Sequence, residues 1–227
     1  MRLTYFGHSA FLLELAGHRL VFDPWLRQNA HGAVDPASVP CDLVLVSHAH
    51  DDHLGDALEL ARLHGATIVA PFELAEHLAA HGAKTIDLMP GGGVELPWGR
   101  IDMTPAVHSS ALELGDGKTR SMGVASGYVV HAGGRTLYHA GDTALFGDMR
   151  LIARHGLDVA LIPIGDFYTM GPVDAIEALH FLRPRLAVPM HFNSNEKIRV
   201  DAIAFAAEAA RAGHRVRVMA PRETLDL

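Results

Sequence analysis

The first forty residues alternate between hydrophobic and polar side chains with the two-residue period of β-strands. This alternation predicts strands over residues 3–6, 10–15 and 19–22, with a turn at Gly17 before the third strand. A short apolar run with branched side chains, at residues 42–47, predicts a further strand that is buried on both faces. The chain is therefore expected to begin as a β-sheet.

Beyond residue 50, hydrophobic residues recur at helical spacing in segments that are separated by further strands. Predicted helices cover residues 55–64, 72–81, 146–155, 173–182 and 196–212. Predicted strands cover residues 67–70, 85–88, 94–96, 100–106, 123–131, 135–139, 158–163, 186–189 and 215–219. Strand-rich segments with helices in both halves of the chain indicate an α/β (α+β) protein in which sheets pack together and helices lie outside. No Pro/Gly-rich linker divides the chain, so residues 1–227 are expected to form a single domain.

Composition narrows the class of protein. Hydrophobic residues make up 49% and charged residues 20% of the 227 residues, as in ordinary globular proteins. A net charge of −7 argues against strong non-specific binding to nucleic acid. The single cysteine, Cys41, excludes an intrachain disulfide, and no apolar run approaches the roughly 20 residues of a membrane span. We therefore expect a cytoplasmic protein with no membrane span, and the sequence leaves a homo-oligomer open.

Histidine is unusually frequent, with 16 residues against 19 lysines and arginines. Neutral imidazole is the commonest metal ligand in proteins, so the places where histidines gather matter. Histidines outside any motif are expected to be surface composition: His18, His31, His64, His77, His81, His155 and His214.

The strongest local signal is the segment SHAHDDH at residues 47–53. It follows the predicted buried strand and precedes a predicted helix. His48 and His50 are two residues apart, so their side chains point to the same side of an extended strand end. After the turn that follows, the side chains of Asp52 and His53 can point toward a second position nearby. Such a cluster is hard to explain by packing, and its spacing predicts a metal centre.

This segment, written His48-x-His50-x-Asp52-His53, resembles the first motif of the metallo-β-lactamase superfamily. Polar residues that end later predicted strands match the remaining ligands of that family, in the segments PAVHS, YHAGDT and VPMHF. The match covers residues 6–195, which is most of the chain. The ligands that the resemblance implies for one metal are His48, His50 and His108. The ligands that it implies for the other metal are Asp52, His53 and His191, with Asp142 between the two ions.

Three further segments narrow the resemblance. GHSAF at residues 7–11, FDPW at 22–25 and IGDFYTMG at 164–171 resemble a branch of short bacterial and archaeal proteins described as metal-dependent hydrolases. This branch is related to L-ascorbate-6-phosphate lactonase and to the phospholipase D that acts on N-acyl phosphatidylethanolamine. The implied fold is a four-layer αββα sandwich with the metals at one edge between the sheets. Fold membership does not supply a substrate.

The implied chemistry needs no serine or cysteine nucleophile. Two cations roughly 3.5–4 Å apart can share one water, supply a bridging hydroxide near neutral pH and polarise the oxygen of a substrate. The imidazole and carboxylate donors suit two divalent ions per chain, Zn²⁺ or Mn²⁺, with Fe²⁺ a weaker candidate. Asp142 stands where the best-known zinc β-lactamases carry cysteine, which argues against antibiotic hydrolysis. His50 stands where diiron flavoproteins carry glutamate, which argues against an oxygen-reducing role.

Several residues are candidates for supporting roles. His8 is expected near the metals, either as a proton donor to the leaving group or as a packing residue. With Asp52 and His139 it forms the candidate catalytic set, although His139 alternates to the other side of its strand and can equally be a core residue. Asp23 can orient a ligand histidine or form a plain turn.

Candidate substrate contacts come from two polar loops. Tyr168 and Thr169 lie in a glycine-bounded loop and can line a pocket. Lys118 and Arg120 follow His108 and can either meet a phosphate or form a solvated turn.

Together these observations predict a metal-dependent hydrolase. Paired metals suit in-line attack on phosphorus, which favours a phosphodiester in a small-molecule or nucleotide-like substrate. The alternative is a lactonase, or an ester or amide hydrolase, that acts on a small anionic molecule. From a different class, an iron-dependent redox protein can be built on the same fold.

Overall fold

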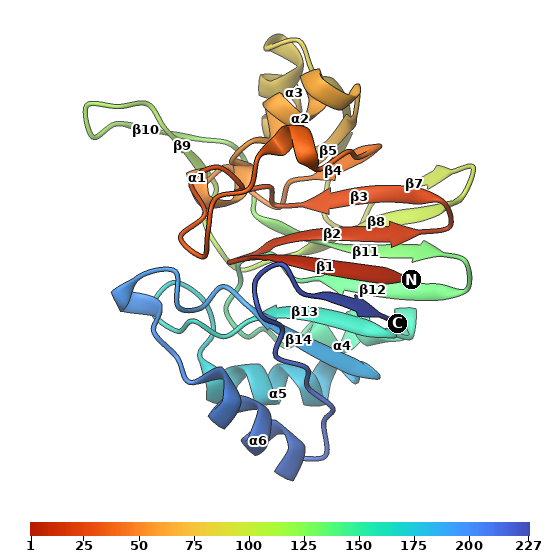
Figure 1. Ribbon diagram of the computed structural model, residues 1–227, viewed down its shortest axis with the longest axis vertical. Coiled ribbons are helices and arrows are strands. Elements are labelled where there is room, and N and C mark those ends of the chain that lie inside the picture. Colours follow the sequence, from red (N-terminus) through yellow and green to blue (C-terminus); the bar gives the residue numbers. More distant parts are fainter.

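The computed structural model describes residues 1–227 and arranges them in four layers. Two β-sheets pack face to face, helices α2 and α3 cover the outer face of one sheet, and α4, α5 and α6 cover the other (Figure 1). The predicted αββα sandwich is confirmed. None of the helices is long and apolar enough to cross a membrane.

The first sheet has seven strands in the spatial order β15-β1-β2-β3-β4-β5-β6. Their bounds are β1 Arg2–Gly7, β2 Ala10–Leu15, β3 His18–Phe22, β4 Leu43–Leu45, β5 Thr67–Pro71, β6 Lys84–Leu88 and β15 Thr224–Asp226. Strands β1 to β3 pair antiparallel, and β3 to β6 pair parallel. The helices on this side are α1 Asp51–Leu54, α2 Ala57–His64 and α3 Phe72–Ala80, with a 3₁₀ turn, η1, at Pro36–Ser38.

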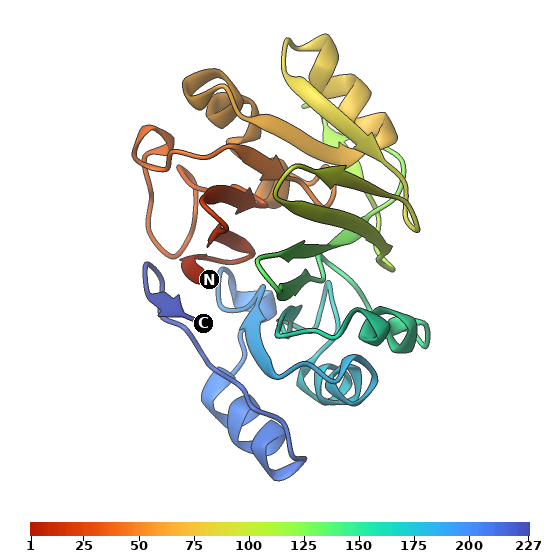
Figure 2. The same ribbon diagram turned by 90° about the vertical axis from the view of Figure 1, so that its right-hand side faces the viewer.

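The second sheet has six strands in the order β14-β13-β12-β11-β8-β7. Their bounds are β7 Gly93–Leu96, β8 Gly99–Pro105, β11 Ser126–Ala132, β12 Arg135–His139, β13 Val159–Pro163 and β14 Leu186–Met190. A separate hairpin joins β9 Ala111–Glu113 to β10 Thr119–Ser121. The outer elements are α4 Met149–Ile152, η2 Ala153–His155, α5 Pro172–Leu182, η3 Glu196–Ile198 and α6 Ala202–Arg211. Figure 2 shows how the two sheets lie against each other.

The predicted helix over residues 196–212 is wrong as one continuous element. The chain forms η3, passes through extended backbone at Arg199, and begins again as α6. Each piece has its own N-terminal cap, because the Asn195 side chain accepts from the Lys197 N–H and the Asp201 side chain accepts from two N–H groups of α6. Two capping side chains therefore divide a segment that hydrophobic spacing alone reads as one helix.

Other boundaries also differ. The predicted strand 215–219 is wrong, since it reduces to a single bridge between Val216 and Ala187 of β14. The predicted helix 146–155 starts later, at Met149, and ends as the 3₁₀ turn η2. The helix predicted from residue 55 starts at Ala57, and a separate turn, α1, precedes it and carries two of the predicted ligands. Strands β9, β10 and β15 are additional to the predicted elements.

The two sheets are connected by hydrogen bonds at the start of the ligand-bearing segment. Tyr128 of β11 is fully buried, and its hydroxyl donates to the Val46 carbonyl at 2.7 Å, with the Val69 carbonyl at 3.1 Å. Nearby, the Ser126 N–H and hydroxyl both reach the Ser47 carbonyl, at 3.0 and 3.1 Å. These bonds fix the backbone immediately before His48 against the second sheet.

Replacing Tyr128 by phenylalanine tests this connection. We expect Tyr128→Phe to lower the free energy of unfolding by about 1–3 kcal/mol, because the buried Val46 carbonyl loses its partner. The control is Tyr138→Phe in β12, since the buried Tyr138 hydroxyl has no well-aligned partner and its removal should be nearly neutral. Urea unfolding measures both variants, and equal losses in the two would contradict this role for Tyr128.

Candidate metal centre

Four strand ends bring the predicted ligands to one edge of the sandwich. In the first sheet, β4 leads through residues 46 and 47 to His48. In the second sheet, His108 follows β8, Asp142 follows β12, and His191 directly follows β14. Strands β12, β13 and β14 are parallel, and β8 and β12 both run antiparallel to β11. Their carboxyl ends therefore meet at the same edge, and the facing edge of the first sheet supplies the rest.

Gly141 permits the close approach of these segments. Its φ of +62° lies in the left-handed region, which glycine tolerates best. A Cβ at this position would lie 2.4 Å from the Ser126 carbonyl oxygen and 2.9 Å from the Ser47 Cβ. The turn before Asp142 thus needs glycine both for its backbone conformation and for space.

The first group of donors consists of His48, His50 and His108, whose ligand nitrogens all lie within 4.8 Å of one another. His48 Nε2 and His50 Nδ1 are 2.9 Å apart. Burial lowers the pKa of all three imidazoles, most strongly for fully buried His48. Neutral imidazoles with convergent nitrogens have lone pairs available for a cation.

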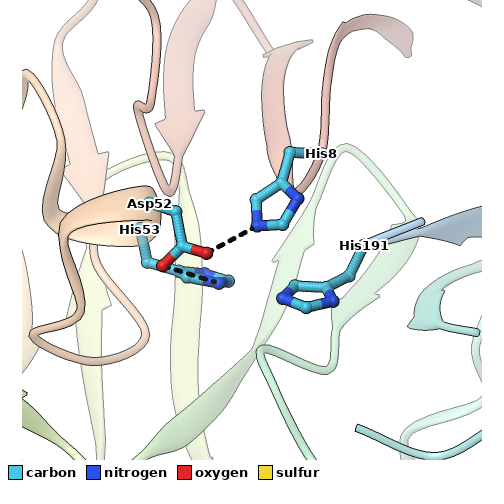
Figure 3. A group of neighbouring side chains, drawn as sticks. All are labelled: His8, Asp52, His53 and His191. Carbon is cyan, nitrogen blue, oxygen red and sulfur yellow. Dashed lines mark hydrogen bonds and ion pairs between the residues drawn. The ribbon is translucent and has the colours of Figure 1, made fainter. Parts of the chain in front are cut away.

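The second group consists of His8, Asp52, His53 and His191, which also converge within 4.8 Å (Figure 3). Asp52 and His53 come from α1, and the other two come from segments that are far apart in the sequence. His8 Nε2 lies 3.1 Å from Asp52 Oδ2, and the His8 and His191 rings are 4.2 Å apart. This group contains the predicted second set of ligands and adds His8 to it.

Asp142 lies between the two groups. Its Oδ2 is 2.9 Å from His191 Nε2 and 3.7 Å from His108 Nε2, while its Oδ1 is 3.3 Å from His53 Nε2. One carboxylate thus contacts members of both groups. The seven predicted ligands are brought together, and Asp142 occupies the position expected of a shared ligand.

Two buried polar atoms at the centre make no well-formed hydrogen bond. His53 Nε2 and Asp142 Oδ1 are both buried, and the 3.3 Å contact between them is not a well-aligned hydrogen bond. Unpaired buried polar atoms are costly and rare in folded proteins. None of the carboxylates of Asp23, Asp52 and Asp142 pairs with lysine or arginine; their partners are histidines. A buried anionic cluster with unpaired nitrogen and oxygen donors fits a bound cation.

The charges within the cluster perturb its pKa values in the direction that favours cations. Burial would raise the pKa of Asp142, but His191 and His53 outweigh it and hold that pKa well below its usual range. Burial would lower the pKa of His53, but Asp142, Asp23 and Asp52 outweigh it and raise that pKa well above the usual value. In the protein alone these carboxylates hold a proton on His53, at a place where a metal ion would serve the same electrostatic purpose.

Asp23 is buried behind the two groups and fixes the orientation of their rings. Its Oδ2 accepts from His53 Nδ1 and from the Ser47 hydroxyl, both at 2.7 Å, and its Oδ1 accepts from the Ser47 N–H at 2.7 Å. Because Ser47 donates its proton to Asp23, its oxygen must accept from His48 Nδ1, 2.9 Å away. Both histidines therefore carry their proton on Nδ1 and direct Nε2 toward the centre, which is the usual arrangement around a metal ligand.

His8 is held in an unusual backbone conformation, with φ of +56°. Its carbonyl accepts from the His191 N–H at 2.8 Å, and its Nδ1 lies 2.9 Å from the Ser194 hydroxyl. Burial and the neighbouring His191 lower the pKa of His8 to about 4. At neutral pH, His8 is therefore a neutral donor to Asp52.

The other predicted site residues lie farther from the donors. His139 is buried between the sheets, where it stacks on Phe22 with ring centroids 5.0 Å apart; its Nε2 bonds the Ser9 carbonyl and its Nδ1 accepts from the Gly141 N–H. Both ring nitrogens of His139 thus face the backbone. Arg120 lies in β10. The pKa of His77 in α3 is lowered mainly by burial, then by His81 and then by the charge of Arg120.

Thr143, which the sequence analysis did not single out, joins three loops of the site. Its hydroxyl accepts from the Val107 N–H at 2.9 Å, and its carbonyl accepts from the Met170 N–H at 2.9 Å. The loop of Tyr168 and Thr169 is thereby attached next to Asp142. A threonine beside a ligand is too common in sequences to be recognised without the fold.

The rim of the site also includes Lys197, another residue that sequence reasoning missed. Its ammonium donates to the Tyr168 hydroxyl at 3.1 Å and lies 4.9 Å from the centre of the Phe167 ring. Both aromatic residues are exposed. Lys197 comes three residues after Ser194, which bonds His8, so the segment that carries this cation is attached to the second donor group.

Comparison with known proteins agrees with this geometry. The family described as "Beta-lactamase superfamily domain" matches residues 18–192. A "UPF0173 metal-dependent hydrolase" from Opitutus terrae is 79% identical over all of both chains, and one from Thermus thermophilus is 45% identical over all of this chain and 99% of the other. The solved structure of Igni18, a metallo hydrolase from Ignicoccus hospitalis, superposes with a TM-score of 0.90 at 39% identity, covering all of this chain and 98% of that one.

The fold, the convergent donors and these relatives define the class. The chain belongs to the metallo-β-lactamase superfamily. Within that superfamily it is a metal-dependent hydrolase, as the relatives from Opitutus terrae and Thermus thermophilus are named.

Replacing Asp23 by asparagine tests the orienting role of its carboxylate. Asparagine cannot accept from His53, the Ser47 hydroxyl and the Ser47 N–H together, because one end of its amide is a donor. We expect Asp23→Asn to weaken zinc binding about 10- to 100-fold, measured by competition with a chelator. The control is Asp42→Asn, which removes a half-exposed carboxylate bonded to the Arg19 N–H. Unchanged zinc affinity in Asp23→Asn would contradict the role.

Proposed function

We propose that the protein holds two divalent metal ions and uses them to hydrolyse phosphodiesters. The observation that carries the proposal is the position of Asp142, whose carboxylate contacts histidines of both donor groups. A single ion would not need two groups of donors that share one carboxylate. Paired ions about 3.5–4 Å apart are a recurrent arrangement in hydrolysis of phosphate esters.

The donors divide between the two ions as follows. The residues that would hold one ion are His48, His50 and His108. The residues that would hold the other are Asp52, His53 and His191, with Asp142 shared. Nitrogen and carboxylate donors without thiolates suit Zn²⁺ or Mn²⁺, and Fe²⁺ ranks below them.

Charge balance supports two ions rather than one. Asp23, Asp52 and Asp142 bring three negative charges into a region where their ion-pair partners are histidines alone. One divalent ion would leave this buried region anionic. Two divalent ions exceed the three negative charges by one positive charge, which favours an anionic substrate or a hydroxide.

When bound, a pair of divalent ions supplies Lewis acidity toward an oxygen of the substrate and a water of lowered pKa as the nucleophile. The chain itself keeps the donors in place: Asp23 and Ser47 hold protons on the outer nitrogens of His53 and His48. His8 donates to Asp52 while Ser194 bonds its other nitrogen. Because His8 has a pKa of about 4, it serves this proposal as a positioning residue for Asp52 and not as the proton donor.

The rim provides contacts for an anionic substrate. Lys197 is exposed and stands beside the exposed aromatic rings of Phe167 and Tyr168. An ammonium next to two rings suits a phosphate that carries an apolar or nucleoside-like group. The Thr169 hydroxyl donates a hydrogen bond to the Met170 carbonyl within this loop. In this proposal Tyr168 contacts substrate, and Arg120 on the β9–β10 hairpin remains a candidate for its distal part.

The decisive experiment compares substrates and metals in one assay. Metal-stripped protein is refilled with Zn²⁺ or Mn²⁺ and given bis(p-nitrophenyl) phosphate, a carboxylic ester and a lactone. We expect metal-dependent release of nitrophenol from the phosphodiester, reduced about 100-fold or more by Asp142→Asn, because the shared carboxylate positions both ions.

Each other outcome points to a named alternative. Turnover of the lactone or the ester alone would replace the phosphodiester by the alternative of a lactonase or ester or amide hydrolase. Oxygen consumption by the Fe²⁺-loaded protein, with no hydrolysis, would favour a redox role. Full activity of Asp142→Asn would contradict the shared-ligand arrangement itself.

Replacing Lys197 by glutamine tests the rim. We expect Lys197→Gln to raise KM for the anionic phosphodiester about two- to fivefold with kcat little changed, since exposed charge pairs contribute less than about 1 kcal/mol. The control is Lys84→Gln, which removes an exposed lysine of the edge strand β6. A KM that stays at the wild-type value in Lys197→Gln, or rises equally in Lys84→Gln, would remove Lys197 from substrate binding.

A further inference from the structure

A second cluster of metal-ligating side chains lies on the outer face of the second sheet. It consists of Asp102 from β8, His131 from β11 and His155 at the end of η2, and its ligand atoms all lie within 4.8 Å of one another. The strand register explains the pairing, because Asp102 stands opposite Val129, two residues before His131 on the same face. His155 then reaches the two strand residues from the layer above.

The distances within this cluster fit one ion. His131 Nε2 lies 3.0 Å from His155 Nδ1 and 3.3 Å from Asp102 Oδ2, and His155 Nδ1 lies 4.0 Å from the same oxygen. A tetrahedral zinc ion with bonds of about 2.0–2.1 Å separates its donors by about 3.3 Å. The observed triangle brackets that value, so small side-chain rotations suffice to place all three atoms around a common point.

Neighbouring residues orient the donors toward that point. Arg100 donates from Nε to Asp102 Oδ1 at 2.7 Å, which leaves Oδ2 directed at the histidines. The Thr136 hydroxyl lies 3.3 Å from His131 Nδ1 and can accept its proton, which leaves a lone pair on the Nε2 that faces His155.

We propose that Asp102, His131 and His155 form a third metal site, which binds a zinc-class divalent ion. Two imidazoles and one carboxylate are a donor set that suits Zn²⁺, Ni²⁺ or Co²⁺. The side chains of Asp102, His131 and His155 are 15%, 29% and 32% exposed, so an ion can enter from solvent and keep a water as its fourth ligand.

This site is separate from the metal centre described above. His131 pairs with Thr136 near the start of β12, whereas Asp142 follows the other end of that strand, beyond the turn at Gly141. In Figure 1 the turn between β11 and β12 lies at the opposite end of these strands from α1. An ion here would link η2 to β8 and β11, and its expected effect is to stabilise the attachment of α4 and η2 to the sheet.

The test measures zinc stoichiometry by equilibrium dialysis at micromolar free Zn²⁺ in the full chain and in two variants. We expect His155→Ala to bind one zinc ion fewer than the wild type and to lose the part of the zinc-induced rise in Tm that this ion provides. The matched control is His180→Ala, because His180 and His214 form a surface pair with nitrogens 3.1 Å apart that belongs to no group of three donors. It should retain the full stoichiometry.

A second measurement follows zinc binding at the individual donor nitrogens. In imidazole ¹H–¹⁵N spectra, zinc should shift the signals of His131 Nε2 and His155 Nδ1 together, and Asp102→Asn should weaken that titration at least tenfold. Equal zinc content in wild type and His155→Ala would overturn the proposal. An equal loss in His180→Ala would also overturn it, since any exposed histidine pair would then suffice. Hydrolytic activity of His155→Ala should match the wild type.

Discussion

The arrangement of the metal centre depends on one buried carboxylate, that of Asp23. It accepts three hydrogen bonds at 2.7 Å, two from Ser47 and one from His53, and through Ser47 it also determines which nitrogen of His48 carries the proton. A single anion thus orients one histidine from each donor group. Asp23 itself adopts a left-handed φ of +41°, a strained conformation that its three bonds and its neighbours must maintain.

The donors come from segments that meet only in the folded chain, so metal binding and folding are coupled. Thr143 bonds the loops that follow β8 and β13, and Tyr128 and Ser126 attach the second sheet to the backbone beside His48. Losing these contacts would separate the donors without altering any of them. The same contacts that hold the sheets together therefore also keep the two donor groups next to each other.

The alternation of apolar and polar residues predicted most of the strands and helices, and the resemblance to a known family implied the sandwich fold and the set of seven donors. Four of these donors, His48, His108, Asp142 and His191, are polar residues that follow the ends of apolar strands. Such residues stand out against their surroundings. Features that depend on distant contacts were not predictable in this way. His155 looked like surface composition, since its partners Asp102 and His131 come within reach only through the register of β8 and β11. The split of the helix over residues 196–212 depends on caps whose strength hydrophobic spacing does not record.

The buried donors and the exposed rim residues have different roles in the site. The donors are fixed by the sheets and by Asp23, and they specify which ions bind and where a nucleophile can form. The rim residue Tyr168 lies in a loop and Lys197 lies in η3, and hydrogen bonds between Met170 and Thr143 and between Ser194 and His8 attach these segments to the centre. Loops held in this way can change sequence without moving the donors. In the proposed function, the residues that select the substrate are therefore ones that the metal ligands do not constrain, and the fold by itself does not specify a substrate.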